Sequence, residues 1–175
     1  MLAVRDGDLN RLGVIFERHH KKLYNFFLRH TGERHSSEDL VQEVFLRFLK
    51  YRHTFRDDSI FETWMYRIAR NVRIDHYSKR KRSVADGTDF DGLAGENPSP
   101  HLEAERSQNH ALLLRALSQL SSDEREAVLL SRFDGMKYQE ISQIQNCAEG
   151  TIKARMHHAM KKLQANFKQL AGDPE

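Results

Sequence analysis

The stretch that decides the fold is LSSDEREAVLLSRFDGMKYQEISQIQNCAEGTIKARMHHAMKKL, residues 120–163. It predicts three helices. Ser121 can cap the first, with Glu124 three residues later completing a capping box. That helix ends at Asp134-Gly135, since glycine tolerates the left-handed conformation of a helix exit. The second helix is short and carries Tyr138, Ile141 and Ile144 on one face, and a tight turn at Asn146-Cys147 follows it.

The third helix of this stretch has two distinct faces. Its apolar residues recur at helical spacing and predict one buried stripe: Ile152, Met156, Ala159, Met160 and Leu163. The opposite face is polar, basic and free of acids: Gly150, Thr151, Lys153, Ala154, His157, His158 and Lys161. A short helix, a tight turn and a helix with a basic outer face favour a helix-turn-helix, which places its second helix in the major groove of DNA. The plainer alternative is a three-helix packing unit with a solvated basic face.

The order of residues here resembles the C-terminal promoter-reading domain of sigma factors, the specificity subunits of bacterial RNA polymerase. The residues that carry the resemblance are Leu120, Glu124-Arg125-Glu126, Arg132-Phe133-Asp134-Gly135, Tyr138, Glu140-Ile141, Cys147 and Glu149-Gly150-Thr151-Ile152-Lys153. A more distant likeness is to the DNA-binding domain of LuxR-type regulators. The resemblance implies that the last helix reads the −35 duplex through Glu149, Gly150, Thr151, Lys153, Ala154, Arg155, His157, His158 and Lys161.

The composition of the chain is that of a soluble protein with one or two small domains. It has 175 residues, of which 30% are charged and 39% hydrophobic. It contains no apolar run of membrane-spanning length and opens with no secretory signal, so we expect no membrane insertion. Its single cysteine, Cys147, cannot form an intramolecular disulfide and suits a reducing cytoplasm.

Charge is unevenly distributed along the chain. Residues 1–85 hold 18 Lys and Arg against 11 Asp and Glu, whereas residues 86–107 hold one Arg against six acids. A basic first half suggests a polyanionic partner. Residues 83–100 are rich in glycine and proline and lack Lys and Arg, which predicts a linker. The expected organisation is therefore a helical domain over 1–85, a flexible acidic linker over 86–107 and a helix-turn-helix domain over 108–175. The next helix after the glycine- and proline-rich stretch is expected to begin around His101 to Glu105.

The N-terminal half predicts three amphipathic helices. Apolar residues from Leu9 to Phe27 give the first, which ends near Gly32. Ser36 or Ser37 would cap the second, which has a core stripe of Val41, Val44, Phe45 and Phe48. After the loop 51–58, Ser59 and Glu62 would form a capping box on the third helix, whose apolar stripe is Phe61, Trp64, Met65, Ile68 and Val72.

The third helix also carries cations and aromatics on its outer side, from Arg67 and Arg70 to Tyr77 and a basic run over 79–82. Such interleaving can stack on unpaired bases while it neutralises phosphates. The alternative is that Phe61 and Trp64 belong to the core and that the arginines form a solvated face.

This half resembles the first domain of sigma factors. The matching residues are Asp39-Leu-Val-Gln-Glu-Val-Phe45, Phe55-Arg56, Asp58-Ser59, Phe61, Thr63-Trp64, Tyr66-Arg-Ile-Ala-Arg-Asn71 and Asp75. Two such domains and nothing else resemble the extracytoplasmic-function (ECF) group. The resemblance implies docking on the beta and beta-prime subunits of core polymerase through Asp39, Gln42, Glu43, Phe45, Leu46 and Arg47. It further implies melting and reading of the −10 element by Phe55, Arg56, Ser59, Phe61, Trp64, Arg67, Arg70, Asn71 and Asp75.

The same resemblance implies promoter DNA as the second partner, an anti-sigma factor as a regulator, a monomer when free, no cofactor and no catalysis. Two alternatives stay open at this point. One is a stand-alone LuxR-like helix-turn-helix regulator; the other is a helical nucleic-acid enzyme with a His/Asp metal centre. The ten histidines invite the second alternative. However, adjacent pairs such as His157-His158 point about 100° apart on a helix and do not chelate together, so no metal site is expected.

Four residues depart from the sigma-factor pattern in the helix-turn-helix. Lys137 and Ala148 stand where a capping Ser is common, and Gln145 and Asn146 stand where Leu-Gly is usual. Asn tolerates the left-handed turn. Each missing hydroxyl cap costs about 1 kcal/mol of helix stability, so we expect this helix-turn-helix to be less stable than those that carry both caps.

Overall fold

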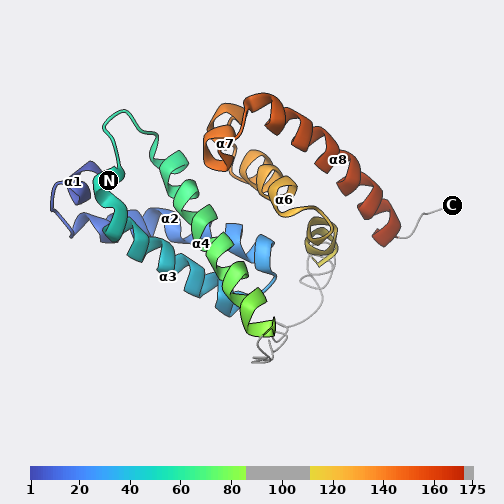
Figure 1. Ribbon diagram of the computed structural model, residues 1–175, viewed down its shortest axis with the longest axis horizontal. Coiled ribbons are helices and arrows are strands. Elements are labelled where there is room, and N and C mark those ends of the chain that lie inside the picture. Colours follow the sequence, from blue (N-terminus) through green and yellow to red (C-terminus); the bar gives the residue numbers. More distant parts are fainter. Residues whose placement is uncertain (86–110, 172–175) are drawn as a thin grey trace. The chain divides into compact units, whose positions relative to one another are not determined.

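The computed structural model describes residues 1–85 and 111–171, which form two compact units, one within Met1–Ala94 and the other within Gly95–Glu175. In these residues every regular element is helical, which confirms the expected all-α fold in two parts (Figure 1). The linker expected over 86–107 and the helix start expected at 101–105 lie outside the described residues. The predicted domain boundaries stay a prediction.

Unit 1 is built from three long helices and two short elements. Helix α2 packs along α3, and α3 packs along α4 (Figure 1). The bounds are α1 (Leu2–Arg5), α2 (Arg11–Thr31), α3 (Arg34–Tyr51), the 3-10 turn η1 (Arg52–Thr54) and α4 (Phe61–Ala85). As predicted, α2 ends at Gly32, which has φ 73° and donates its N–H to the Leu28 carbonyl. The four-residue α1 was not predicted, because it is too short to show a hydrophobic period.

The predicted starts of α3 and α4 are wrong. Helix α3 begins at Arg34 with Glu33 in the capping position, and Ser37 lies buried inside it, donating to the Glu33 carbonyl at 2.6 Å. Helix α4 begins at Phe61, so Ser59 precedes the residue in the capping position. Serines near a helix start are ambiguous from sequence, because a Ser side chain bonds the backbone one turn back as readily as it caps.

The core of unit 1 is aromatic. Phe26, Phe27, Phe48 and Tyr66 are almost fully buried, and Phe48 stacks at a tilt on Trp64 with ring centroids 5.1 Å apart. Such pairs add to the hydrophobic stabilisation of the core. The predicted stripe of α3, Val41, Val44, Phe45 and Phe48, is buried as expected, as are Trp64, Met65, Ile68 and Val72 of α4. Leu9 is an exception to the expected pattern, since it lies before α2 and is half exposed.

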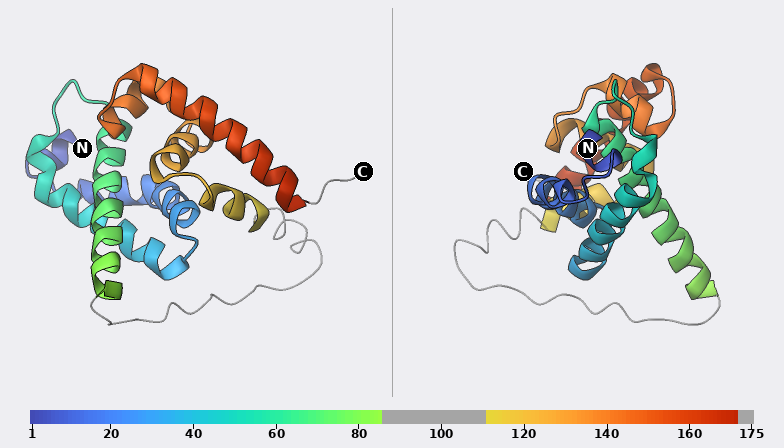
Figure 2. Two further views of the ribbon diagram at one scale, coloured as in Figure 1. Left: turned by 45° about the vertical axis from the view of Figure 1, so that its right-hand side comes forward. Right: turned by 90° about the vertical axis from the view of Figure 1, so that its left-hand side faces the viewer.

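Unit 2 contains the predicted helix-turn-helix, in which α8 packs on both α6 and α7 (Figure 2). Residues 111–118 are helical and precede α6 (Ser122–Val128), the π-helical stretch η2 (Leu129–Phe133), α7 (Tyr138–Gln145) and α8 (Glu149–Ala171). The Ser121–Glu124 capping box is present. Gly135 and Asn146 take left-handed conformations, with φ 69° and φ 50°, so both predicted turns are confirmed.

Two details of unit 2 were not predicted. The helix that starts at Ser122 widens into η2 before Gly135, with the Asp134 N–H donating to the Leu129 carbonyl five residues back. The buried stripe of α8 is also narrower than expected. Ile152, Met156 and Ala159 are buried, but Met160 is 40% exposed.

Candidate functional surfaces

The outer face of α3 carries most of the residues expected to dock on polymerase. Asp39, Gln42 and Leu46 are exposed, and Leu46 is unusually open for a leucine at 62%. Phe45, predicted in the same set, is instead in the core, edge-on to Phe16 and Phe48 with ring centroids 5.0 Å away in both pairs. It can support this face only from beneath.

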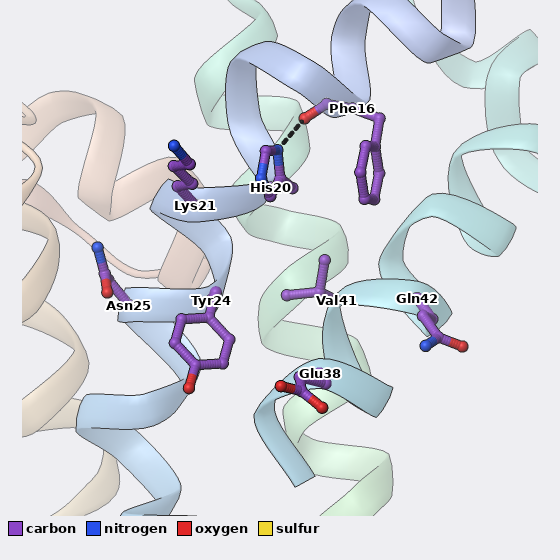
Figure 3. Close-up of a pocket in the computed structure, with 8 residues that line it drawn as sticks. All are labelled: Phe16, His20, Lys21, Tyr24, Asn25, Glu38, Val41 and Gln42. Atoms are coloured by element: carbon purple, nitrogen blue, oxygen red, sulfur yellow. Dashed lines mark hydrogen bonds between the residues drawn. The ribbon is translucent and has the colours of Figure 1, made fainter. Parts of the chain in front are cut away.

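A groove of about 470 Å³ runs along this face between α2 and α3 (Figure 3). Phe16 and His20 stack in it, and the His20 ring nitrogen lies 2.8 Å from the Phe16 carbonyl. Sequence analysis missed the α2 side of the groove. Phe16 belongs to the predicted apolar stripe of α2, and only the structure shows that its side chain is 38% exposed. The lining residues are Phe16, His20, Lys21, Tyr24, Asn25, Glu38, Val41 and Gln42.

Arg47 joins α3 to α4. Its Nε contacts Glu43 Oε1 at 2.8 Å and its Nη2 contacts Asp75 Oδ2 at 2.7 Å, and its side chain is only 19% exposed. Burial lowers the pKa of the guanidinium, but the hydrogen bonds to both carboxylates outweigh it and leave the pKa raised. Arg47, predicted for docking, and Asp75, predicted for −10 reading, therefore form one ion-pair network.

Two aromatics expected at the −10 surface lie in the core. Phe55 is 6% and Trp64 7% exposed, and the two rings meet edge-on at 5.4 Å. The indole N–H of Trp64 also donates to Thr54 Oγ1 at 3.1 Å. Neither ring can stack on a base without leaving this cluster. Phe61 is half-buried against His19, with ring centroids 5.0 Å apart; burial lowers the pKa of His19.

Polar residues are exposed along α4, among them Asp75, which pairs with Arg47. Arg67, Asn71 and Asp75 are exposed at intervals of four and share one face of the helix. Arg70 beside them is half-buried. In the preceding loop Arg56 is exposed and pairs with Asp58 at 3.3 Å, while Ser59 is half-buried.

This loop is held by a residue that sequence analysis missed. Arg5, in α1, donates through Nη1 to the Phe55 carbonyl at 3.2 Å and to the Asp57 carboxylate. The hydrogen bond from Arg5 also lowers the pKa of Asp6. No local pattern links residue 5 to residue 57, so only the folded chain brings them together.

The outer face of α8 is exposed as predicted. Lys153 pairs with Glu149 one turn earlier at 2.9 Å. The exposed residues are Glu149, Gly150, Thr151, Lys153, Ala154, His157, His158 and Lys161. Arg155, predicted among the DNA contacts, is instead turned inward: its guanidinium lies 2.6 Å from Gln145 Oε1 and 3.1 Å from Asp123 Oδ2.

The missing hydroxyl caps of the helix-turn-helix are partly replaced. At α7 the Glu140 carboxylate accepts the Lys137 backbone N–H at 2.7 Å, which is one half of a capping box. At the end of α7 the left-handed Asn146 donates its N–H to the Ser142 carbonyl.

Unit 2 also carries an apolar groove of about 800 Å³, in which Phe133, Met160 and Phe167 are each about 40% exposed.

Within residues 1–85 and 111–171 no three His, Cys, Asp or Glu side chains are grouped to hold a metal ion. Across the helices that the structure describes, none combines the length and apolarity that crossing a membrane requires.

Two family models match the chain. Sigma-70 region 2 matches residues 15–83, and Sigma-70, region 4 matches residues 110–163. The first match covers the part that a stand-alone helix-turn-helix regulator would not need, so that alternative is not favoured.

The chain is similar over nearly its full length to ECF RNA polymerase sigma factors. SigM of Bacillus subtilis is 30% identical over 161 residues, which are 91% of this chain and 96% of SigM. SigL of Mycobacterium tuberculosis is 32% identical over 159 residues, 90% of this chain and 89% of SigL.

Solved structures agree with these matches. The sigma factor RpoE of Bartonella quintana, in complex with the anti-sigma factor NepR, has a TM-score of 0.74 and 28% identity, covering 89% of this chain and 96% of RpoE. CnrH, in complex with the cytosolic domain of CnrY, shares the fold with a TM-score of 0.70 at 21% identity. The two family regions in order, together with about 30% identity over nine tenths of the chain, lead to one conclusion: this protein belongs to the ECF sigma factors of bacterial RNA polymerase.

Proposed function

We propose that this sigma factor divides its work between its two units. Unit 1 docks on core polymerase and reads and melts the −10 element, and unit 2 reads the −35 element. The observation that carries this division is the pair of exposed polar faces, one on α4 and one on α8, on helices whose opposite sides are buried. The protein performs no chemistry of its own and acts in the bacterial cytoplasm, where its polymerase is.

Docking uses the outer face of α3 and the adjoining groove. Leu46, whose side chain is 62% exposed, provides an apolar anchor, and Asp39 and Gln42 provide polar contacts around it. An apolar centre with a polar rim is the usual anatomy of a protein interface. Phe45 and Arg47 contribute indirectly, the first by packing beneath the helix and the second by holding Glu43.

The docking surface is tested by Leu46→Lys, with Leu9→Lys as the matched control. Both leucines are more than half exposed in unit 1, at 62% and 51%, so neither substitution should unfold the chain. We expect Leu46→Lys to weaken core binding at least tenfold in a fluorescence titration, as loss of an interface anchor does, and Leu9→Lys to bind normally. Equal affinities for the two variants would refute this surface.

Reading of the −10 strand is assigned to the exposed side of α4. Asn71 has amide donors and an acceptor that suit a base edge, and Arg67 one turn earlier can contact phosphate. Phe55 and Trp64 are in the core, whereas Phe61, the first residue of α4, is only half-buried and is the remaining aromatic of the set expected at the −10 surface. Extruding a base costs a few kcal/mol, and stacking on an aromatic returns about 1–3 kcal/mol.

Run-off transcription with permanganate footprinting tests this assignment. Asn71→Ala should reduce strand opening and change the preference at one −10 position, while Ser78→Ala, exposed further along α4, should open the promoter like the parent. Unchanged opening by Asn71→Ala on matched and altered −10 sequences alike would remove Asn71 from the reading site.

Reading of the −35 duplex is assigned to α8, with Thr151, Ala154 and His158 on the side that faces the bases and Lys153 and Lys161 contacting phosphates. A phosphate contact contributes evenly on every sequence and its loss lowers the salt slope by about one, whereas a base contact contributes about 1–3 kcal/mol at one position. Lys153→Ala and His158→Ala should separate these two effects in promoter-binding assays. Discrimination that survives in every α8 variant would argue against this helix.

An anti-sigma factor is the proposed regulator, supported by the likeness to RpoE, whose structure was solved in complex with NepR. Such a partner should compete with core polymerase for the chain. Capture of the tagged chain from its own host, followed by displacement with core polymerase, tests this; a partner that is not displaced does not act by competition.

A further inference from the structure

Arg155 occupies the inside corner of the helix-turn-helix. Its Nη1 donates to Gln145 Oε1 at 2.6 Å and to Cys147 Sγ at 3.4 Å, and its Nη2 contacts Asp123 Oδ2 at 3.1 Å. These partners belong to the end of α7, the turn and the start of α6. One guanidinium on α8 therefore contacts α7, the turn after it and α6.

Gln145 extends these contacts into the core of unit 2. It is 6% exposed, and its Nε2 donates to the Asp123 carbonyl at 3.0 Å and to Glu126 Oε2 at 2.9 Å. Glu126 is fully buried, and a buried carboxylate is tolerated only when it is hydrogen-bonded or paired. Both ends of the Gln145 amide are thus used, one toward Glu126 and one toward Arg155.

The apolar residues of α8 decide which of its faces is buried. Ile152, Met156 and Ala159 are buried against α6 and α7, but hydrophobic burial is non-directional. Hydrogen bonds require alignment as well as distance. A planar guanidinium with several donors in a rigid fork is well suited to hold one helix at a set angle to two others.

We propose that Gln145 and Arg155 form a polar clasp that sets the orientation of α8, and with it the discrimination among −35 sequences. Arg155 is then a positioning residue and makes no contact with DNA. The inference rests on the proposed reading of the −35 duplex by α8. A helix that presents several base-reading side chains at once loses their joint fit when it tilts, so the clasp acts on sequence discrimination more than on general affinity.

The test compares Arg155→Met with Gln145→Met in the full-length chain bound to core polymerase. Binding is measured on promoters with matched and altered −35 sequences over a range of salt concentrations. If the clasp sets the helix, both variants lose about tenfold in discrimination, the worth of about one base contact, and both keep the parent's salt slope. Since Gln145 is buried, an effect of Gln145→Met on discrimination cannot come from a lost DNA contact.

The opposite result is equally clear. If Arg155 contacts a phosphate, Arg155→Met weakens binding evenly on all sequences and lowers the salt slope by about one, while Gln145→Met binds like the parent; the clasp is then wrong. Retained discrimination in both variants also overturns it. Should Gln145→Met fail to fold, Asp123→Asn, which removes the partially exposed ion pair to Arg155, must show the same loss of discrimination in smaller measure.

Amide hydrogen exchange separates this inference from the proposed function. The clasp predicts faster exchange at the end of α7 and in the first turns of α8 in both Met variants, without any DNA present. If the parent itself does not distinguish −35 sequences, the proposed function fails, and the exchange rates alone decide the clasp: unchanged rates overturn it.

Discussion

Phe55→Ala should destabilise unit 1 by about 3 kcal/mol, the low end of the cost of truncating a buried aromatic. The Phe55 ring is 6% exposed and meets Trp64 edge-on at 5.4 Å and Phe61 at 6.1 Å. Its removal leaves a cavity beside the indole. Part of the cost is recovered because Phe55 lies in a loop, which relaxes more readily than a helix.

The assay is urea unfolding followed by tryptophan fluorescence. Trp64 is the single tryptophan of the chain, so this signal reports on unit 1 alone. The control is Leu46→Ala, at a side chain 62% exposed, which should stay within about 0.5 kcal/mol of the parent. A loss of about 3 kcal/mol is smaller than a typical stability of about 5–15 kcal/mol, so Phe55→Ala should remain folded at low temperature.

The reasoning also predicts what Phe55→Ala does to promoters. Under conditions in which the variant is folded, it should keep the parent's preference among −10 sequences, because the ring packs the core and does not meet a base. A free-energy change below about 1 kcal/mol combined with a lost −10 preference would refute this. Phe55 would then have to leave the cluster and contact DNA, as the resemblance to sigma factors implied.

Three further predictions concern unit 2, and far-UV circular dichroism measures each of them. Ser121→Ala removes the capping hydroxyl that accepts the Glu124 N–H at 3.3 Å and should cost about 1 kcal/mol; an unchanged unfolding midpoint would mean that Glu124 maintains the cap alone. Asn146→Ala should cost about 1 kcal/mol at φ 50°, whereas Asn146→Gly should cost almost nothing; equal losses would contradict the left-handed turn. The hydrogen bond from Lys162 holds the pKa of Glu124 below its usual range. The ion pair therefore stabilises the folded protein fully above the ordinary carboxyl pKa, and this stabilisation is lost as the pH falls through the lowered pKa of Glu124. Lys162→Met should therefore flatten the pH dependence of thermal unfolding below the ordinary carboxyl pKa, and an unaltered slope would assign that dependence to other carboxylates.

The sequence by itself determined the long helices of this protein and most of the residues on their inner sides. Apolar residues at helical spacing identified the stripes of α3 and α4, and the special residues Gly32, Gly135 and Asn146 marked the exits of helices and turns. These signals are local, since a helix face and a left-handed turn are both set within a few residues. The order of two sigma-like motif sets added the family, which the comparisons confirm.

Which polar and aromatic side chains face outward was decided only by the tertiary structure. Phe55 and Arg155 both look like nucleic-acid contacts in the sequence, yet one completes an aromatic cluster with Trp64 and the other binds Gln145 and Asp123. Likewise, Arg5 reaches the loop at Asp57, 52 positions away. A long side chain at the edge of a helix can turn to solvent or to a neighbour, and its choice depends on partners that local sequence does not bring together. The packing of α6, α7 and α8 supplies the partners of Arg155, and the packing of unit 1 supplies those of Phe55 and Arg5; both exist only in the folded chain.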